Sequence, residues 1–535
     1  STANAYALTT AQIAALETRD LAAMATASVA VLATTQVVAF GTTQIQALTT
    51  DQIVGLRSSQ VAALSTDQIV ALSSTQVLNF STANAYALTT TQVAALETTD
   101  LLALSTLNLQ ALSTNQVLAF TTDQIVALST AQIVAMRAVQ TAALSTNQIV
   151  ALSTRQMAAL STANTTAFTT AQIAALETGD LDTLSTVNLQ ALLTTQIAAL
   201  TTVQIDALLT SQTVNLLTTQ VVALSSAQIV ALTSTQTLNL NSAEVSALLT
   251  TQLVAMETDD VVALSTSNLL VLSTLQVLAL STNQAQALTT VQVINLSTTQ
   301  IAALATRQIT SLATSQVQAL GTAQLMGMRT AQFASLDSWQ IIALSSAQVA
   351  ALGTSNVAAL TTAQLVALET ADLVVLSTVN LQALATSQIV VLLTEQIAAL
   401  TTLQVVGFST FEVAALSTAQ VVALSTTQVQ ALRTEQVIAL QTLQIAALTS
   451  DQVVAWTTAQ AQVVGTAQAA ALTSTQIAAL ETRDLASMLT SSVAALSTTQ
   501  VVAITTAQVQ SLTTLQVVGL RTSQVAAFTP PRWPI

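Results

Sequence analysis

The chain has 535 residues and a net charge of −14; it is 52% hydrophobic, and charged residues make up only 6% of it. It is therefore too apolar for an acidic disordered tail, and it lacks the basic stripe that nucleic-acid binding requires. Cysteine, histidine and lysine are absent, which excludes thiolate and Schiff-base nucleophiles and the commonest zinc ligands. Because a Ser or Thr hydroxyl without an activating base is a weak nucleophile, we expect neither an enzyme nor a small-molecule substrate.

Sixty-six consecutive octapeptides fill residues 1–528 without insertion or deletion (66 × 8 = 528), and residues 529–535 form a short tail. The unit reads x-Thr-x-Gln-(Ile/Val)-x-Ala-Leu, and its positions are numbered 1 to 8 below. A fixed period indicates that each unit buries its apolar face against neighbouring units, so we expect one continuous solenoid over 1–528.

The restricted positions of the octad predict a short helix. Positions 4, 5 and 8 lie on one helical face, and the variable positions 3 and 6 lie on another. Thr at position 2 is the expected N-cap. A capping box from position 1 to position 4, as in Ser105 and Asn108, fits less well, because position 1 is Leu193, Gly321 or Arg433 in other octads.

A β-solenoid with one strand per octad is the alternative fold, since Thr, Val and Ile favour strands. Against it, the pattern does not alternate, and only 9 glycines are available for 66 corners. Tight strand corners normally need Gly, Asn or Asp. The all-α solenoid is therefore our prediction.

The Gln at position 4 is expected to stabilise contacts between units. Helices of about one turn are unstable alone and must be stabilised by stacking. Each octad ends in a chain reversal whose carbonyls lack partners within the helix, and a Gln amide can supply both donors and acceptors. The Gln column thus predicts a hydrogen-bond ladder between octads.

Six octads depart from the pattern, with Glu at position 1 and Asp at position 4. The next octad then has Asn or Ser at position 4, and the octad two before usually has Asn or Glu there; we call each such group of four octads a cassette. The acidic pairs, which recur at intervals of 80, 80, 80, 112 and 112 residues, are Glu17 and Asp20, Glu97 and Asp100, Glu177 and Asp180, Glu257 and Asp260, Glu369 and Asp372, and Glu481 and Asp484.

The cassette spacing predicts the size of one coil. If all cassettes lie on one side of the solenoid, the number of octads per coil must divide both 10 and 14. Two octads per coil, or 16 residues, satisfies this condition and can still enclose a core.

The cassettes have two interpretations. Shorter side chains in place of Gln would change the local twist. Alternatively, the carboxylates of all twelve Glu and Asp residues named above, together with amide and carbonyl oxygens, would suit Ca²⁺. Two or three carboxyl groups per site are few, so calcium is the second interpretation, and no other cofactor is expected.

The tail contains three prolines and cannot continue the helical pattern. We expect it either to cap the last coil or to reach the next subunit as a strap. The residues assigned to this contact are Phe528, Pro530, Pro531 and Trp533. The ordinary octads at both ends predict open apolar faces and head-to-tail association of identical chains into a fibre.

The octad, as in Leu48-Thr49-Thr50-Asp51-Gln52-Ile53-Val54-Gly55-Leu56, resembles repeat arrays of very large secreted surface proteins of Gram-negative bacteria, similar to adhesins or sheath proteins. This resemblance implies an extracellular or cell-surface location. The sequence has no run of about 18 apolar residues that could span a membrane, and the start at Ser1, in mid-pattern, is expected to be processed or truncated.

We therefore expect a structural subunit of an extracellular filament, sheath or surface layer whose partner is another copy of itself. The alternative is a surface adhesin or a rod that binds glycans, ice or another lattice through its regular Thr columns. The variability of positions 3 and 6 argues against a uniform recognition face.

Overall fold

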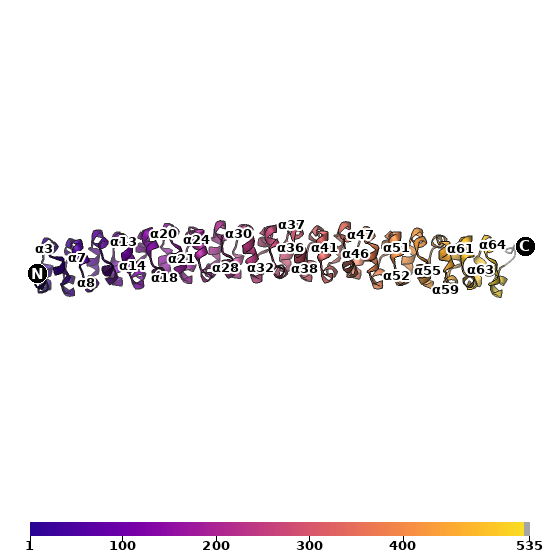
Figure 1. Cartoon of the computed structure of the whole chain (residues 1–535), viewed down its shortest axis with the longest axis horizontal. Coiled ribbons are helices and arrows are strands. Elements are labelled where there is room, and N and C mark those ends of the chain that lie inside the picture. The colour runs from indigo at the N-terminus through magenta and orange to yellow at the C-terminus, as the bar shows by residue number, and fades with distance from the viewer. Residues whose placement is uncertain (529–535) are drawn as a thin grey trace. The chain divides into compact units, whose positions relative to one another are not determined.

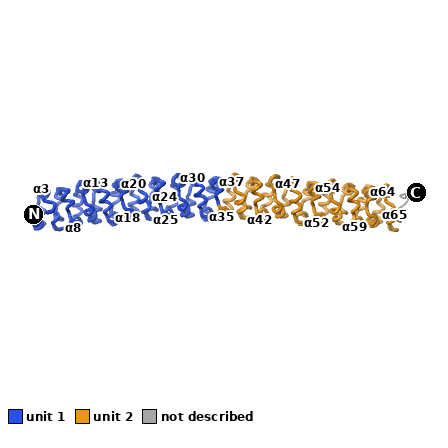
Figure 2. The backbone as a smooth tube through the Cα atoms, viewed as in Figure 1, with its two compact units in different colours: residues 1–272 blue, residues 273–535 orange. Residues whose placement is uncertain are grey.

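Every octad forms one short α-helix in the computed structural model, which describes residues 1–528 (Figure 1). No β-strand occurs in this range. The all-helical prediction is confirmed, and the β-solenoid alternative is wrong. The chain divides into two compact units, Ser1–Leu272 and Ser273–Ile535, each built from the same stacked octads (Figure 2). The octad pattern continues in sequence through the boundary, and one continuous array stays a prediction.

The helices follow the octads closely. Helix αn begins at position 2 of octad n, from α1 (Thr2–Tyr6) to α66 (Thr522–Ala527), and contains four to six residues. Typical examples are α2 (Thr10–Ala14) and α6 (Thr42–Ala47). The four-residue helices are α23 (Thr178–Leu181), α27 (Thr210–Thr213), α49 (Thr386–Ile389) and α62 (Thr490–Val493).

The N-cap is at position 1, so the predicted cap at position 2 is wrong. The Ser65 hydroxyl accepts the Gln68 backbone amide at 3.2 Å, and Gln68 Oε1 accepts the Ser65 amide at 2.9 Å. Where position 1 has no hydroxyl the second bond remains: the Ala33 amide donates to Gln36 Oε1 at 2.7 Å. Because Gln supplies half of the capping box, position 1 can vary, and this variation concealed the cap in the sequence.

The corners between helices need no glycine. After α6, Leu48 (φ −62°, ψ 134°) and Thr49 (φ −70°, ψ 159°) are both extended. Any L-residue adopts these angles without strain. Two consecutive extended residues therefore redirect the chain after α6, and this corner needs no special turn-forming residue.

The Gln ladder is confirmed. Gln140 is fully buried; its Nε2 donates to the carbonyls of Leu109 and Leu112, both at 2.8 Å, and its Oε1 accepts the Arg137 amide at 2.9 Å. These carbonyls belong to positions 5 and 8 of the octad four places earlier. The same register recurs through most octads of each unit, for example from Gln340 to Leu312.

One coil contains between three and four octads, so the prediction of two octads is wrong. Helix packing joins each helix to the helix three octads away, as α10 (Ser74–Leu78) packs on α13 (Thr98–Ala103). The Gln ladder joins octads four apart. Three octads are 24 residues and four are 32, so a turn ends between these limits.

The prediction of two octads assumed that one coil contains a whole number of octads, which must then divide both 10 and 14. This condition does not apply, because one coil contains between three and four octads. An interval of ten octads corresponds to three coils (3 + 3 + 4 octads), and an interval of fourteen octads corresponds to four coils (3 + 4 + 3 + 4 octads). In unit 1, α3 (Thr18–Ala22) and α13 lie along one edge of the view, and in unit 2 so do α47 (Thr370–Val375) and α61 (Thr482–Ser487) (Figure 1). Cassettes of one unit can therefore share a side without a 16-residue coil.

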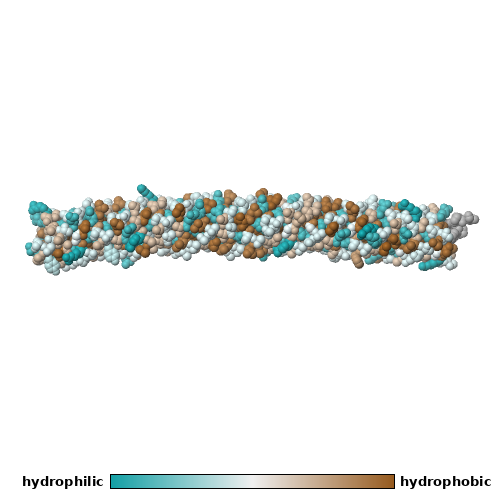
Figure 3. All heavy atoms as spheres, viewed as in Figure 1, coloured by the Kyte–Doolittle hydropathy of each residue, from teal (hydrophilic) through white to brown (hydrophobic). Residues whose placement is uncertain are grey.

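Burial follows position in the octad. Positions 4, 5 and 8 are buried along most of each unit, whereas positions 1, 2, 3 and 6 are mostly exposed. Position 7 faces position 2 of the octad three places earlier, and there is little room between them. A Cβ on Gly327 would lie 3.3 Å from Thr298 Cβ, which explains why Ala predominates at position 7. On the visible face, polar and apolar side chains are interspersed (Figure 3).

Replacing one ladder Gln should open its coil contact locally. We expect Gln140→Leu to lose about 1–3 kcal/mol of local stability, because the Arg137 amide loses its acceptor and the Leu109 and Leu112 carbonyls each lose one of two donors. Hydrogen exchange of octads 14 and 18 measures this directly. The matched control is Val139→Thr at an exposed neighbouring position. Wild-type protection in Gln140→Leu would contradict a stabilising ladder.

Candidate functional site

In five of the six cassette pairs, the Asp is buried and the Glu is half-buried or exposed. Asp100 is 3% exposed and lies inside the coil, whereas Glu97 at position 1 is exposed. Asp180, Asp260, Asp372 and Asp484 are likewise buried. Within residues 1–528, no three Asp, Glu, His or Cys side chains gather closely enough to hold a metal ion. The calcium interpretation stays a prediction.

The first cassette differs from the others because it lies in the first coil. Asp20 is exposed there, and it lines an open pocket of about 410 Å³ together with Asn4 and Ser28. Arg19 lies 3.6 Å from the Asp20 carboxylate and 3.9 Å from Glu17.

Four of the five buried Asp side chains accept a hydroxyl from the octad three places earlier. Ser74 Oγ donates to Asp100 Oδ1 at 2.6 Å, and Thr458 Oγ1 donates to Asp484 Oδ1 at 3.0 Å. Ser234 and Ser346 make the same bond to Asp260 and Asp372. These position-2 hydroxyls were missed by the sequence analysis, since their partners are found only once the coil size is known.

Each Asp also leaves a gap in the ladder. A carboxylate has no N–H to donate, and the Leu72 carbonyl, which a Gln at position 100 would bind, receives no side-chain donor in the described chain. Asp100 Oδ2 and Asp484 Oδ2 are buried without a hydrogen-bond partner. Burial raises the pKa of Asp100 and of Asp484, and it does the same for Asp180 and Asp260.

The Asn side chains of the cassettes restore the ladder. Asn84 Nδ2 donates to the Leu56 carbonyl at 3.1 Å, and Asn108 Nδ2 donates to the Phe80 carbonyl at 2.7 Å. Asn is shorter than Gln, so it usually reaches only the position-8 carbonyl. A cassette is therefore a place where the coil contact is modified, first by a carboxylate and then by a short amide.

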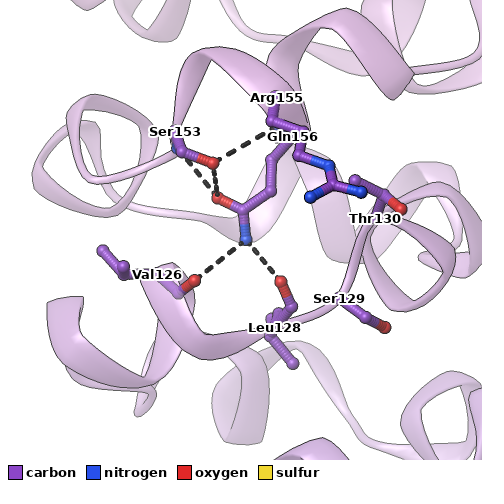
Figure 4. A pocket seen from close by; sticks show the side chains of 7 residues that line it. All are labelled: Val126, Leu128, Ser129, Thr130, Ser153, Arg155 and Gln156. Carbon is purple, nitrogen blue, oxygen red and sulfur yellow. Dashed lines mark hydrogen bonds between the residues drawn. The ribbon is translucent and has the colours of Figure 1, made fainter.

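A small, polar groove lies between α17 (Thr130–Ala135) and α20 (Thr154–Ala159) and has a volume of about 280 Å³ (Figure 4). Its Gln156 amide already donates to the Leu128 carbonyl at 2.7 Å. Arg155 is the charged group of this groove, and no nucleophile with an adjacent base lines it. We therefore find no reaction centre in it.

Ten matches to the ALTTAQ repeat together cover more than half of the chain. They span residues 13–50, 46–74, 93–130, 125–154, 173–210, 253–290, 340–370, 365–402, 405–442 and 477–514. The chain belongs to the ALTTAQ repeat family. A comparison with curated proteins gave no match. None of the helices between residues 1 and 528 has the length and apolar character needed to cross a bilayer.

Asp100→Asn should stabilise its coil contact at neutral pH. The Asn amide can donate to the Leu72 carbonyl as Asn108 does to Phe80, and the substitution removes a buried ionisable group. Because the pKa of Asp100 is raised on folding, wild-type stability is greatest below the ordinary Asp value and falls as pH rises through the raised value. We expect a gain of about 1 kcal/mol at pH 7 and little at low pH.

Hydrogen exchange of octads 9 and 13 at both pH values measures this change, with Asp123→Asn as the control at an exposed position. Weaker protection of Asp100→Asn at pH 7 would contradict the assignment.

Proposed function

We propose that this chain is a structural protein, the subunit of an extracellular filament, sheath or surface layer. The observation that carries the proposal is the repetition of one internal contact, the Gln ladder with its apolar core, through octad after octad. Such an array has extent and regularity but no dedicated pocket, which suits a scaffold better than a catalyst.

The same contact can join two arrays end to end. In the first coil of the described chain, Leu16 is half-buried and Gln12 is exposed, whereas the equivalent internal residues are buried. In the last coils, Leu512 and Leu520 are half-buried, and within residues 1–528 no Gln amide reaches their carbonyls. At the N-terminal end of such an array the position-4 Gln amides lack their ladder carbonyls, and at the C-terminal end the position-8 carbonyls lack a Gln donor. Stacking of two copies would therefore continue the ladder.

This association is head to tail and heterologous, so it would extend into a fibre. Phe528, assigned to the contact by the sequence, is buried at the end of the described chain. Pro530, Pro531 and Trp533, the other residues assigned to the predicted strap, lie outside the described residues.

A lattice- or glycan-binding role is the second candidate. Position-2 Thr residues are not the helix caps, and Thr34, Thr42 and Thr98, for example, are exposed. Their hydroxyls are more available than the sequence analysis assumed. The helices that carry them follow the coil around its axis, however, so they do not form one flat recognition face. Binding of the dispersed protein to a glycan array or to ice would favour this second role.

Blocking one end of the array tests the proposed assembly. In Leu16→Glu, a charge enters the first-coil face, and we expect particles of wild-type helical content that remain single in negative-stain microscopy and sedimentation. Ala11→Glu, at an exposed position of the same octad, should still form fibres. Fibres of normal length from Leu16→Glu would contradict end stacking. Dispersed particles of the wild-type protein would exclude the filament role itself.

A further inference from the structure

Glu244 occupies a Gln position of the ladder and is 1% exposed. It lies in α31 (Ser242–Ala247), and its Oε2 accepts the Asn241 amide at 2.8 Å, as Gln Oε1 does in ordinary octads. Glu and Gln have the same shape, so Oε1 of Glu244 takes the place of the Gln Nε2. This oxygen is buried and has no hydrogen-bond partner.

The groups that face this place in other octads are carbonyl oxygens. Gln228 Nε2 donates to the carbonyls of Ile197 and Leu200 at 2.9 and 2.8 Å. By the same register, Glu244 Oε1 is directed toward the carbonyls of Thr213 and Leu216. Two acceptors at hydrogen-bond separation repel each other unless a proton lies between them.

We infer that Glu244 is a proton-dependent joint of the solenoid: as a neutral carboxylic acid it donates to the Leu216 carbonyl and completes the ladder, and as a carboxylate it breaks this contact. The N–H···O separations in neighbouring octads suit a hydrogen bond and are too short for an ion to be inserted between the two oxygens. A proton therefore fits the position better than a metal cation.

The surroundings offer no compensating charge. Helix α31 packs on α28 (Thr218–Ala223) and α34 (Thr266–Leu270), and the ladder register directs Glu244 toward α27. None of these three helices carries an ionisable side chain. Burial accordingly raises the pKa of Glu244 to about 7, although the bond from the Asn241 amide opposes the shift. The proton is thus retained in the folded chain at pH values where an exposed Glu has lost it.

The direction of the pH effect follows from this shift. The folded chain binds the proton more tightly than the unfolded chain, so the contribution of the joint is complete below the ordinary Glu value of 4.5 and is lost as pH rises through about 7. The joint is therefore closed in mild acid and loosened in mild alkali. This inference does not depend on the proposed filament role.

Hydrogen exchange of the full chain at about pH 5 and about pH 8.5, corrected for intrinsic rates, tests the inference. We expect protection in octads 27 and 31 to fall on the order of a hundredfold at the higher pH. Glu244→Gln, which restores the family residue, should keep protection high at both values. Glu412→Gln, another buried Glu at position 4, should leave the profile of octad 31 unchanged.

Transfer of the effect provides a second test. Gln228→Glu, whose ladder partner octad 25 (residues 193–200) has no ionisable side chain, should bring the same pH dependence to octads 25 and 29. In protein with ¹³C-labelled Glu carboxyls, the resonance lost in Glu244→Gln should titrate near neutral pH. The inference is overturned by a pH-independent wild-type profile, by persistence of the effect in Glu244→Gln, or by recovery of protection at high pH with calcium chloride, which would assign the gap to a cation.

Discussion

The buried Gln at position 4 is the interaction on which the rest of this structure depends. Helices of four to six residues are unstable alone, because nucleation costs more than one turn returns. One Gln amide caps its own helix and binds two carbonyls four octads earlier. It gives a donor to the position-8 carbonyl, and it gives a second donor to the position-5 carbonyl, which already accepts a backbone amide. Since the same amide recurs every eight residues, one local contact repeated along each unit determines how the chain coils.

The helical fold and the Gln ladder could be predicted from the sequence, whereas the coil size and the hydroxyl contacts of the cassettes could not. Helical spacing of positions 4, 5 and 8 was sufficient for the fold, and the amide of Gln68 or Gln140 was sufficient for the ladder. The coil size depends on the extended angles of residues such as Leu48 and Thr49, which ordinary residues adopt without a sequence signature. Position 4 was expected to be buried, but the hydroxyl of Ser74 could be assigned to Asp100 only after the coil was known.

Substitutions in the ladder give the uniform array its local differences. Asn preserves a donor and shortens its reach, Asp removes the donor and accepts a hydroxyl from another octad, and Glu keeps the shape of Gln while exchanging a donor for an ionisable oxygen. Raised pKa values at Asp100 and Glu244 have the same cause, a carboxyl group buried where the fold requires an amide. The array therefore contains ionisable groups at positions where most octads have an amide.

The most direct test of the account is the distance between spin labels on successive octads, since the chain has no cysteine and introduced pairs can be labelled specifically. Labels at the exposed residues Thr91, Leu107 and Asn115 sample steps of two and three octads. With a coil of three to four octads, the Thr91–Asn115 distance is shorter than the Thr91–Leu107 distance. The opposite order, with Thr91 closer to Leu107, would contradict the coil and the ladder that defines it.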